Sequence, residues 1–231
     1  MSFSGYRNIV VLTGAGISRS AGLATYRGPG GLWSDPKLAA LSHASALAAQ
    51  RTEVTDMFWS FRAAIQTAEP TAAHRALAAF EARCTGNFLI VTQNVDGLHQ
   101  RAGSTNVVEY HGTLARWHCE RCALELVPPP GRPPVHCNVR MRPSVVLFDE
   151  MIPAEAEHAA KSALRDCDLF VAIGTSGTVW PASSFVKSAE YAGARRVLLN
   201  LEIFDDARAL FSECIAGPSD ELVPKWFQST K

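Results

Sequence analysis

Two polar segments of the chain carry the residue types from which active sites are made. Gln93, Asn94 and Asp96 supply two amides and a carboxylate, and His111 supplies an imidazole. Each group follows an apolar run that is typical of a buried strand, the first of them Phe88–Val91. In open α/β sheets, ligands bind where the strands end. We therefore predict an active site at this edge of a parallel sheet.

A glycine-rich turn near the N-terminus predicts a cofactor for that site. The apolar run Asn8–Leu12 leads directly into Gly14-Ala15-Gly16-Ile17-Ser18, and Gly22 follows. Glycines let a phosphate approach bare backbone donors, and a helix that begins there would point its N-terminal N–H groups at a pyrophosphate. The spacing differs from Gly-x-Gly-x-x-Gly, so a tight turn without a ligand is the alternative.

Two later apolar runs end in the same way. Asp168–Ile173 leads into Gly174-Thr175-Ser176, and Arg195–Leu199 leads into Asn200-Leu201-Glu202. A carboxylate after a late strand is suited to accept hydrogen bonds from a ribose diol, which gives Glu202 one interpretation. A solvated loop carboxylate is the other.

These segments, together with Tyr26-Arg27-Gly28 and Gly31-Leu32-Trp33, resemble the sirtuins, the NAD-dependent protein lysine deacylases. The resemblance runs in order from about residue 8 to about residue 224. It implies an α/β fold, with a Rossmann-like parallel sheet covered by helices on both faces, a smaller helical lobe and a zinc-ribbon-like loop insert. We expect a single catalytic domain, 1–231, with its core at about 1–33, 71–117 and 142–231, the helical lobe at 34–70 and the insert at 118–141.

The resemblance also assigns the cofactor and its contacts. It implies NAD, with the pyrophosphate near the glycine-rich turn, the adenosine near the two late strands and the nicotinamide near Asn94 and Asp96. The residues expected to bind NAD are Gly14, Ala15, Gly16, Ser18, Tyr26, Arg27, Trp33, Gln93, Asn94, Asp96, Gly174, Thr175, Ser176, Asn200, Glu202 and Ser219.

In the implied reaction the acyl-lysine oxygen attacks the ribose carbon as nicotinamide leaves, giving free lysine and O-acyl-ADP-ribose. His111 would take a ribose hydroxyl proton as general base, with Asn94 and Asp96 completing the catalytic set. An imidazole suits that role because its ordinary pKa of about 6.5 lies near working pH. The alternatives are that His111 is a core histidine, and that Asn94 and Asp96 only cap a helix. We interpret His74 and His99 as structural.

The acyl pocket is expected to involve Trp59 and Arg62. The resemblance is strongest to the desuccinylase branch, in which a tyrosine and an arginine three residues apart face the acyl group; here tryptophan takes the tyrosine position. Spacing i, i+3 places both on one helix face. Arg62 would then bind a succinyl or malonyl carboxylate, while the alternative is a surface arginine paired with Asp56 or Glu69.

The peptide substrate is expected to dock along an extended segment that follows the insert. The family pairs the stretch 143–148 with the substrate backbone by strand addition. The expected peptide contacts are Val146, Leu147 and Phe148. Asp149 stands where the family commonly has glycine, and a carboxylate there would either attract basic peptide residues or crowd the peptide.

The insert carries three clustered cysteines rather than the four of the family's zinc site. Cys119 and Cys122 form one Cys-x-x-Cys pair, and only Cys137 remains of the second. His136 and His118 are the nearby candidates for a fourth ligand, although ligation by adjacent His136 and Cys137 would be geometrically awkward. The sequence leaves two alternatives open, a Cys3His zinc site and a metal-free loop packed on prolines.

Composition limits the partners. The 231 residues carry 22 basic and 22 acidic side chains, so no whole-chain field favours nucleic acid or an anionic membrane. No apolar run is long enough to span a bilayer, and we expect a cytoplasmic protein that is a monomer and acts on acylated-lysine proteins or peptides. Alternative functions are protein mono-ADP-ribosyltransferase, NAD hydrolase and an NAD-responsive binding module.

Overall fold

A six-stranded parallel sheet forms the centre of the protein. The computed structural model describes residues 5–25, 31, 34–175 and 182–228. The strands lie in the order β11-β10-β9-β1-β2-β3, which is the doubly wound Rossmann order, with β1 in the middle. The six strands are β1 Asn8–Thr13, β2 Asn87–Thr92, β3 Val107–Glu109, β9 Leu169–Ile173, β10 Arg195–Asn200 and β11 Glu213–Ala216. The predicted fold class is thereby confirmed.

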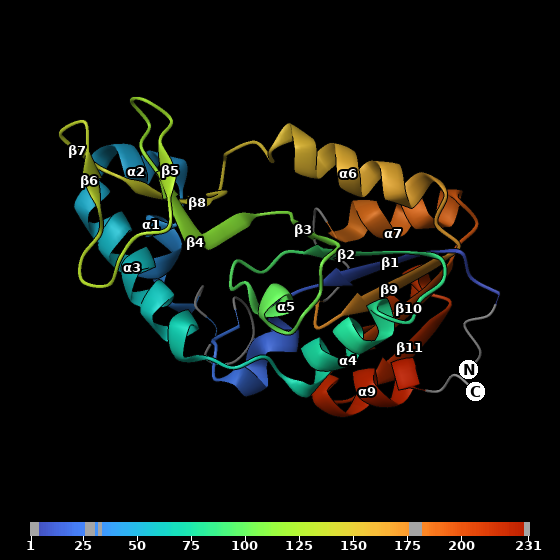
Figure 1. Ribbon diagram of the computed structural model, residues 1–231. Coiled ribbons are helices and arrows are strands. Elements are labelled where there is room, and N and C mark those ends of the chain that lie inside the picture. Colours follow the sequence, from blue (N-terminus) through green and yellow to red (C-terminus); the bar gives the residue numbers. More distant parts are fainter. Residues whose placement is uncertain (1–4, 26–30, 32–33, 176–181, 229–231) are drawn as a thin grey trace.

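Helices cover both faces of this sheet, as Figure 1 shows. One face is covered by α4 (Ala72–Glu81) and α9 (Ser219–Gln228), and the other by α6 (Ala154–Arg165), α7 (Ala182–Tyr191) and α8 (Asp205–Leu210). Because side chains of a strand alternate between faces, β1 must be apolar throughout to serve both layers.

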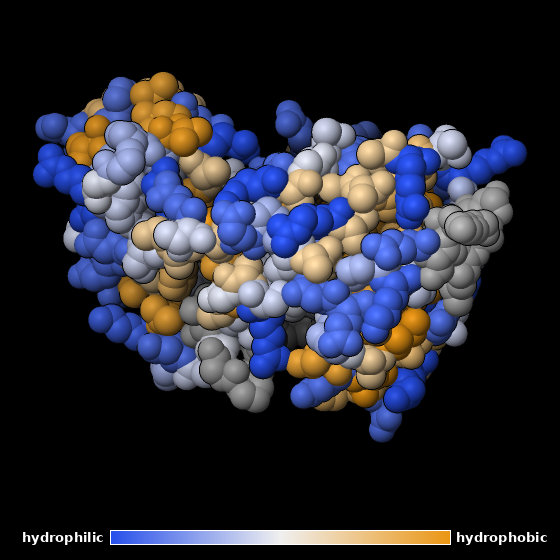
Figure 2. Space-filling view, turned by 60° about the horizontal axis from the view of Figure 1, so that its bottom comes forward, coloured by the Kyte–Doolittle hydropathy of each residue, from blue (hydrophilic) through white to orange (hydrophobic). Residues whose placement is uncertain are grey.

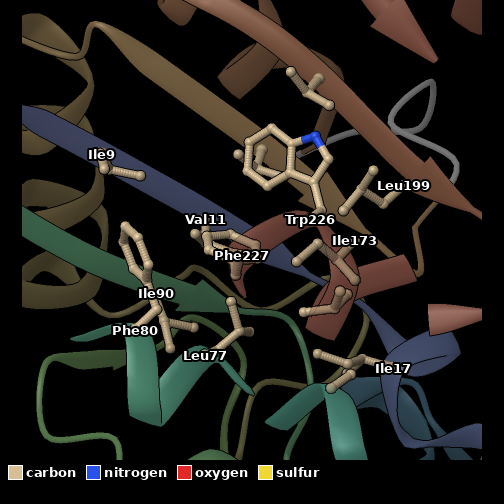
Figure 3. Close-up of a cluster of buried hydrophobic side chains, with 14 of the residues drawn as sticks. Ile9, Val11, Ile17, Leu77, Phe80, Ile90, Ile173, Leu199, Trp226 and Phe227 are labelled. Carbon is tan, nitrogen blue, oxygen red and sulfur yellow. The ribbon is translucent and has the colours of Figure 1, made fainter. Parts of the chain in front are cut away.

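The central strand shows this division directly. Ile9 and Val11 pack in one cluster with Leu77 and Phe227, which come from the helices of the first face (Figure 3). Val10 and Leu12 point the other way and pack with residues of the second face. Each of these β1 side chains is at most 2% exposed.

A smaller lobe is built from the two stretches that interrupt the sheet. The predicted helical lobe contains α1 (Pro36–Leu41), α2 (Ala44–Ala49) and α3 (Arg51–Thr67). Its own core includes Leu41, Phe58, Trp117 and Met141, so the helices pack on the insert as well as on each other. In the space-filling view this lobe lies at the left of the larger one, with hydrophobic residues gathered at its outer end (Figure 2).

The insert and the two strands that flank it, β4 and β8, form two small antiparallel sheets. One has the order β5-β4-β8 and the other is the hairpin β6-β7. Their bounds are β4 Gly112–His118, β5 Glu125–Leu126, β6 Val135–His136, β7 Val139–Arg140 and β8 Arg142–Val145. The proline-rich stretch 128–134 contains no helix or strand, as the lack of N–H donors in proline predicts. No helix within the described ranges is both long and apolar enough to cross a membrane.

Candidate active site

Two glycine-containing loops meet at the point where the strand order reverses. The N–H of Gly14 donates to Ile173 O at 3.0 Å, and the N–H of Gly16 donates to Gly174 O at 2.9 Å. A Cβ on Gly16 would lie 2.7 Å from the Cα of Gly174, closer than real Cβ contacts allow. These glycines are therefore required for the close approach of the loops after β1 and β9, at the crevice where doubly wound sheets bind ligands.

The element after this turn differs from the regular α-helix that we expected. Ala15–Ala21 is a 3-10 helix, η1, and it ends at Gly22 with a φ of 80°. Ile17 and Ser18 are buried within it. The hydroxyl of Ser219, at the start of α9, donates to Gly16 O at 3.2 Å, so the turn is also tied to the last helix.

Three of the predicted residues form one hydrogen-bonded group below this turn. Ser18 Oγ donates to Asp96 Oδ2 at 2.7 Å, and Asn94 Nδ2 donates to Gly14 O at 3.1 Å and to Ser18 Oγ at 3.2 Å. The other oxygen of Asp96 accepts from Leu98 N, the first N–H of the short helix α5 (Leu98–Arg101), at 2.9 Å. The N-cap of α5 is Gly97, so Asp96 supports the helix start from one residue outside the cap and belongs to the hydrogen-bonded group as well.

Asn94 retains one unused acceptor in this group. Its side chain is buried, and Oδ1 has no hydrogen-bond partner within the described residues. A buried amide oxygen without a donor is costly, so the site is suited to a ligand that donates a hydrogen bond there. The carboxamide of nicotinamide is such a donor, and the residues present fit the predicted cofactor.

His111 lies after β3 with one ring nitrogen held by the main chain. Nδ1 is 3.0 Å from Gln93 O, and because a carbonyl only accepts, Nδ1 carries the proton and Nε2 keeps its lone pair. Burial lowers the pKa of the imidazole, and the contact with Gln93 opposes this shift. The ring is therefore positioned as a neutral base.

His74 and His99 form a separate buried pair that sequence patterns do not reveal. Their ring centroids are 4.7 Å apart, and His99 Nε2 is 2.9 Å from Thr13 Oγ1. His74 belongs to a capping box with Thr71 at the start of α4. Burial lowers the pKa of His74 to about 4, which keeps the ring uncharged. These contacts agree with the structural interpretation of both residues.

The adenosine side of the predicted site is only partly described. Asn200 Nδ2 donates to Glu202 O at 2.9 Å, which shapes the loop after β10. Glu202 is exposed. In the loop after β9, Thr175 Oγ1 accepts a hydrogen bond from Gln93 Nε2 at 3.3 Å. Four predicted cofactor residues lie outside the described residues: Tyr26, Arg27, Trp33 and Ser176.

Trp59 and Arg62 lie together on α3, facing the insert. The Arg62 guanidinium carbon is 4.9 Å from the Trp59 ring centroid, and Nη2 donates to Pro128 O at 2.7 Å. Trp59 Nε1 donates to Gly131 O at 3.1 Å. Both side chains therefore contact the proline-rich loop, a contact that no sequence pattern predicted.

The suggested surface partners of Arg62 are engaged elsewhere. Asp56 pairs with Arg140, and Glu69 pairs with Arg101 at 3.3 Å. Arg62 is only 6% exposed, so the alternative of a surface arginine is wrong. Within the described part of the chain, its guanidinium has no carboxylate partner, and Nε is buried without a hydrogen bond.

The expected peptide-docking residues already use their N–H groups. Val146 N donates to His111 O at 2.9 Å, and Leu147 N donates to Glu150 Oε2 at 2.8 Å. Phe148 N donates to Ser42 O at 2.9 Å, so the segment before α2 lies along this edge. Any added strand must therefore use other donors, and the nearest candidate is the residue that follows Phe148.

The three cysteines and His136 come together as a candidate metal centre. One ligand atom from each of Cys119, Cys122, His136 and Cys137 lies within 4.8 Å of all the others. The φ of Cys137 is 50°, in the left-handed region, and this backbone turn brings adjacent ligands to the same point. A hydrogen bond from His136 lowers the pKa of Cys119 to about 6, whereas the neighbouring Cys122 raises the pKa of Cys137 to about 11, so the thiolate that zinc binds is favoured at Cys119 but not at Cys137.

Comparison with known proteins places this geometry in a family. The Sir2 family model matches residues 14–181. An NAD-dependent protein deacylase of Shewanella oneidensis is 41% identical over 233 residues, which cover 95% of this chain and 93% of that protein. A protein named NAD-dependent protein deacylase 2, from Pyrobaculum aerophilum, is 39% identical and covers 97% of this chain and 92% of its own length.

Solved structures agree. A Sir2 homologue in complex with NAD has a TM-score of 0.88 at 29% identity, covering 98% of this chain and 90% of that chain. Sir2Tm bound to a propionylated peptide has a TM-score of 0.83 at 26% identity, covering 98% and 94% of the two chains. With a family model that spans most of the chain, and with the glycine turn, Asn94, Asp96 and His111 in one site, the chain belongs to the Sir2, or sirtuin, family.

Proposed function

We propose that this protein is an NAD-dependent protein lysine deacylase, which releases nicotinamide and O-acyl-ADP-ribose. The observation that carries the proposal is the position of His111, held by Gln93 O beside the group formed by Ser18, Asn94 and Asp96. Relatives that match nearly the whole chain carry the same activity in their names.

The residues of the site divide the work between binding and proton transfer. The glycine turn and Ser18 would hold NAD, which supplies the electrophilic ribose carbon when bound. Asn94 Oδ1, which has no partner among the described residues, would accept a hydrogen bond from the carboxamide, and Nε2 of His111 would take a proton from a ribose hydroxyl. Water completes the reaction, so that one acyl group passes from lysine to the ribose.

The direct test follows both products. The full chain is incubated with NAD and one lysine peptide, either acetylated or not acylated, and free lysine peptide and nicotinamide are measured together. Equal release of the two, only with the acylated peptide, supports the proposal. Nicotinamide release that does not depend on acylation would instead indicate an NAD hydrolase or a transferase.

Arg62 supports a finer proposal, that acidic acyl groups such as succinyl or malonyl are removed. A buried guanidinium without a carboxylate is expensive, and desolvation lowers the pKa of Arg62 accordingly. An acyl carboxylate would supply the missing charge and replace the contact with Pro128 O. Trp59 stacks on the same guanidinium and keeps its orientation.

The test of acyl preference compares two arginines of the same helix. Arg62→Met should lower kcat/KM for the succinyl peptide by at least about tenfold, the value of one lost charge-assisted pair, and leave the acetyl peptide nearly unchanged. Arg51→Met is the matched control, since Arg51 also joins α3 to the insert, through Arg140 O at 3.1 Å. A similar loss in both variants, or for both peptides, would contradict carboxylate recognition.

A further inference from the structure

Asp149 has an unusual backbone conformation at the end of the expected peptide-docking segment. Its φ is 70°, in the left-handed region that favours glycine. Of the four non-glycine residues described with positive φ, the other three lie in the insert that holds the candidate metal centre. Aspartate tolerates this conformation better than most residues, because its short polar side chain forms local hydrogen bonds.

The carboxylate of Asp149 is held in a fixed direction. His43 Nδ1 lies 2.8 Å from Asp149 Oδ2, and the His43 ring packs on Phe148 with centroids 5.1 Å apart. The backbones are paired as well, because Phe148 N donates to Ser42 O and Ala44 N donates to Phe148 O at 3.0 Å. Two distant segments thus determine where this charge lies.

The same residue begins the free part of the edge. Both main-chain groups of Phe148 are used by the segment before α2, whereas within the described residues the N–H and C=O of Asp149 make no hydrogen bond. The Asp149 side chain is 74% exposed. Its neighbour Glu150 is neutralised by Arg142, whose Nη2 lies 2.8 Å from Oε2, so Asp149 is the accessible negative charge of the pair.

We propose that Asp149 makes the enzyme prefer acylated peptides with a cationic side chain next to the acyl-lysine. A peptide paired with the main chain of Asp149 would place a neighbouring side chain within reach of the carboxylate. Oδ2 is occupied by His43, which leaves Oδ1 for an arginine or lysine of the substrate. This inference rests on the proposed deacylase function.

The experiment measures kcat and KM for acetyl-lysine peptides that are identical except for one flanking residue, arginine, alanine or glutamate. Asp149→Asn removes the charge and keeps a residue that tolerates positive φ. Asp166→Asn, an exposed position after α6, is the matched control. We expect the wild type and the control to favour arginine over glutamate by about threefold, the size of one exposed ion pair.

In Asp149→Asn, we expect the ratio of kcat/KM for the arginine peptide to that for the glutamate peptide to fall to about one. The change should lie in KM, and kcat for the alanine peptide should stay at the wild-type value. The wild-type ratio should also fall in about 0.5 M NaCl, where exposed charges are screened. A ratio that is unchanged in Asp149→Asn, or absent from the wild type, overturns the inference. Failure of the wild type on every acylated peptide would instead overturn the proposed function.

Discussion

The polar groups at the sheet edge and those that we propose to contact the substrate differ in how fully they are paired. At the sheet edge, Gly14, Ser18, Asn94 and Asp96 bond to one another, and the strands behind them, β1 and β2, are mostly buried. By contrast, Arg62 has no carboxylate partner within the part of the chain that the structure describes, and the Asp149 side chain is 74% exposed. Among the described residues, the first region leaves one acceptor unpaired, whereas the second holds a buried cation without a carboxylate and a largely exposed carboxylate.

This difference indicates that the groups proposed to react and the groups proposed to recognise the substrate lie in different parts of the molecule. Groups that react are held by main-chain contacts at strand ends, so they change little when surface residues change. The groups that we propose to select the substrate, Arg62 and Asp149, are held by a loop of the insert and by the turn before α2. We therefore expect variants at the sheet edge to affect all substrates alike, and variants in the small lobe to affect substrates unequally.

The sharpest way to break this comparison is His111→Ala. Loss of the general base should lower kcat by on the order of 100-fold to 10,000-fold for acetyl and succinyl peptides alike, with little change in thermal stability. His158→Ala removes an exposed histidine of α6 and is the control. Substantial deacylation by His111→Ala would show that the base lies elsewhere.

A variant of the candidate metal centre tests whether the stability of the small lobe depends on bound zinc. Cys122→Ser should lower zinc affinity by at least about 100-fold, more than loss of an outer-shell partner does, and should lower the thermal midpoint. Zinc content per chain and thermal unfolding are the measurements. Cys84→Ser, a cysteine outside the cluster, should change neither. Equal zinc content in the two variants would rule out the Cys3His site.

Gly16→Ala tests the packing of the sheet edge. The new methyl group would meet Gly174 Cα and O at 2.7 and 2.8 Å, and overpacking of this kind costs about 1–3 kcal/mol. We expect the free energy of unfolding, measured in urea, to fall by that amount and the KM for NAD to rise. Gly5→Ala has no atom within 4 Å and should leave both unchanged. Normal stability in Gly16→Ala would mean that the two loops separate freely.

The smallest effect is expected in the pH dependence. Burial lowers the pKa of His111 below its usual 6.5, so the neutral base persists to lower pH and activity is lost only as pH falls through the lowered value. The acid limb of kcat/KM for an acetyl peptide should therefore lie below pH 6.5. An acid limb above 6.5 would mean that an anionic group stabilises the protonated ring.

Most of the sheet was predictable because its strands are continuous apolar runs. The run 88–91 lies within β2, and the run 8–12 lies within β1, with only end residues added. The catalytic group was predictable for the same reason, since its residues follow those strands directly. The doubly wound order itself was implied by resemblance rather than by any local pattern.

The selecting groups were less predictable, since they depend on contacts between irregular segments. The bond from Arg62 to Pro128 O requires the path of a proline-rich loop that no periodicity describes. Adjacent ligation by His136 and Cys137 requires a left-handed residue, which a sequence without glycine there does not indicate. The pairing of 42–44 with Phe148 joins segments far apart in the chain.

The central position of β1 has a consequence for folding. Val11 lies opposite Ile90 in one neighbouring strand and opposite Val171 in the other, so its hydrogen bonds close very long loops. Folding slows as the contacts that must form join more distant parts of a chain. Because β1 is synthesised long before β9, its second edge stays unpaired until β9 is present, and until then that edge is open to association with other chains.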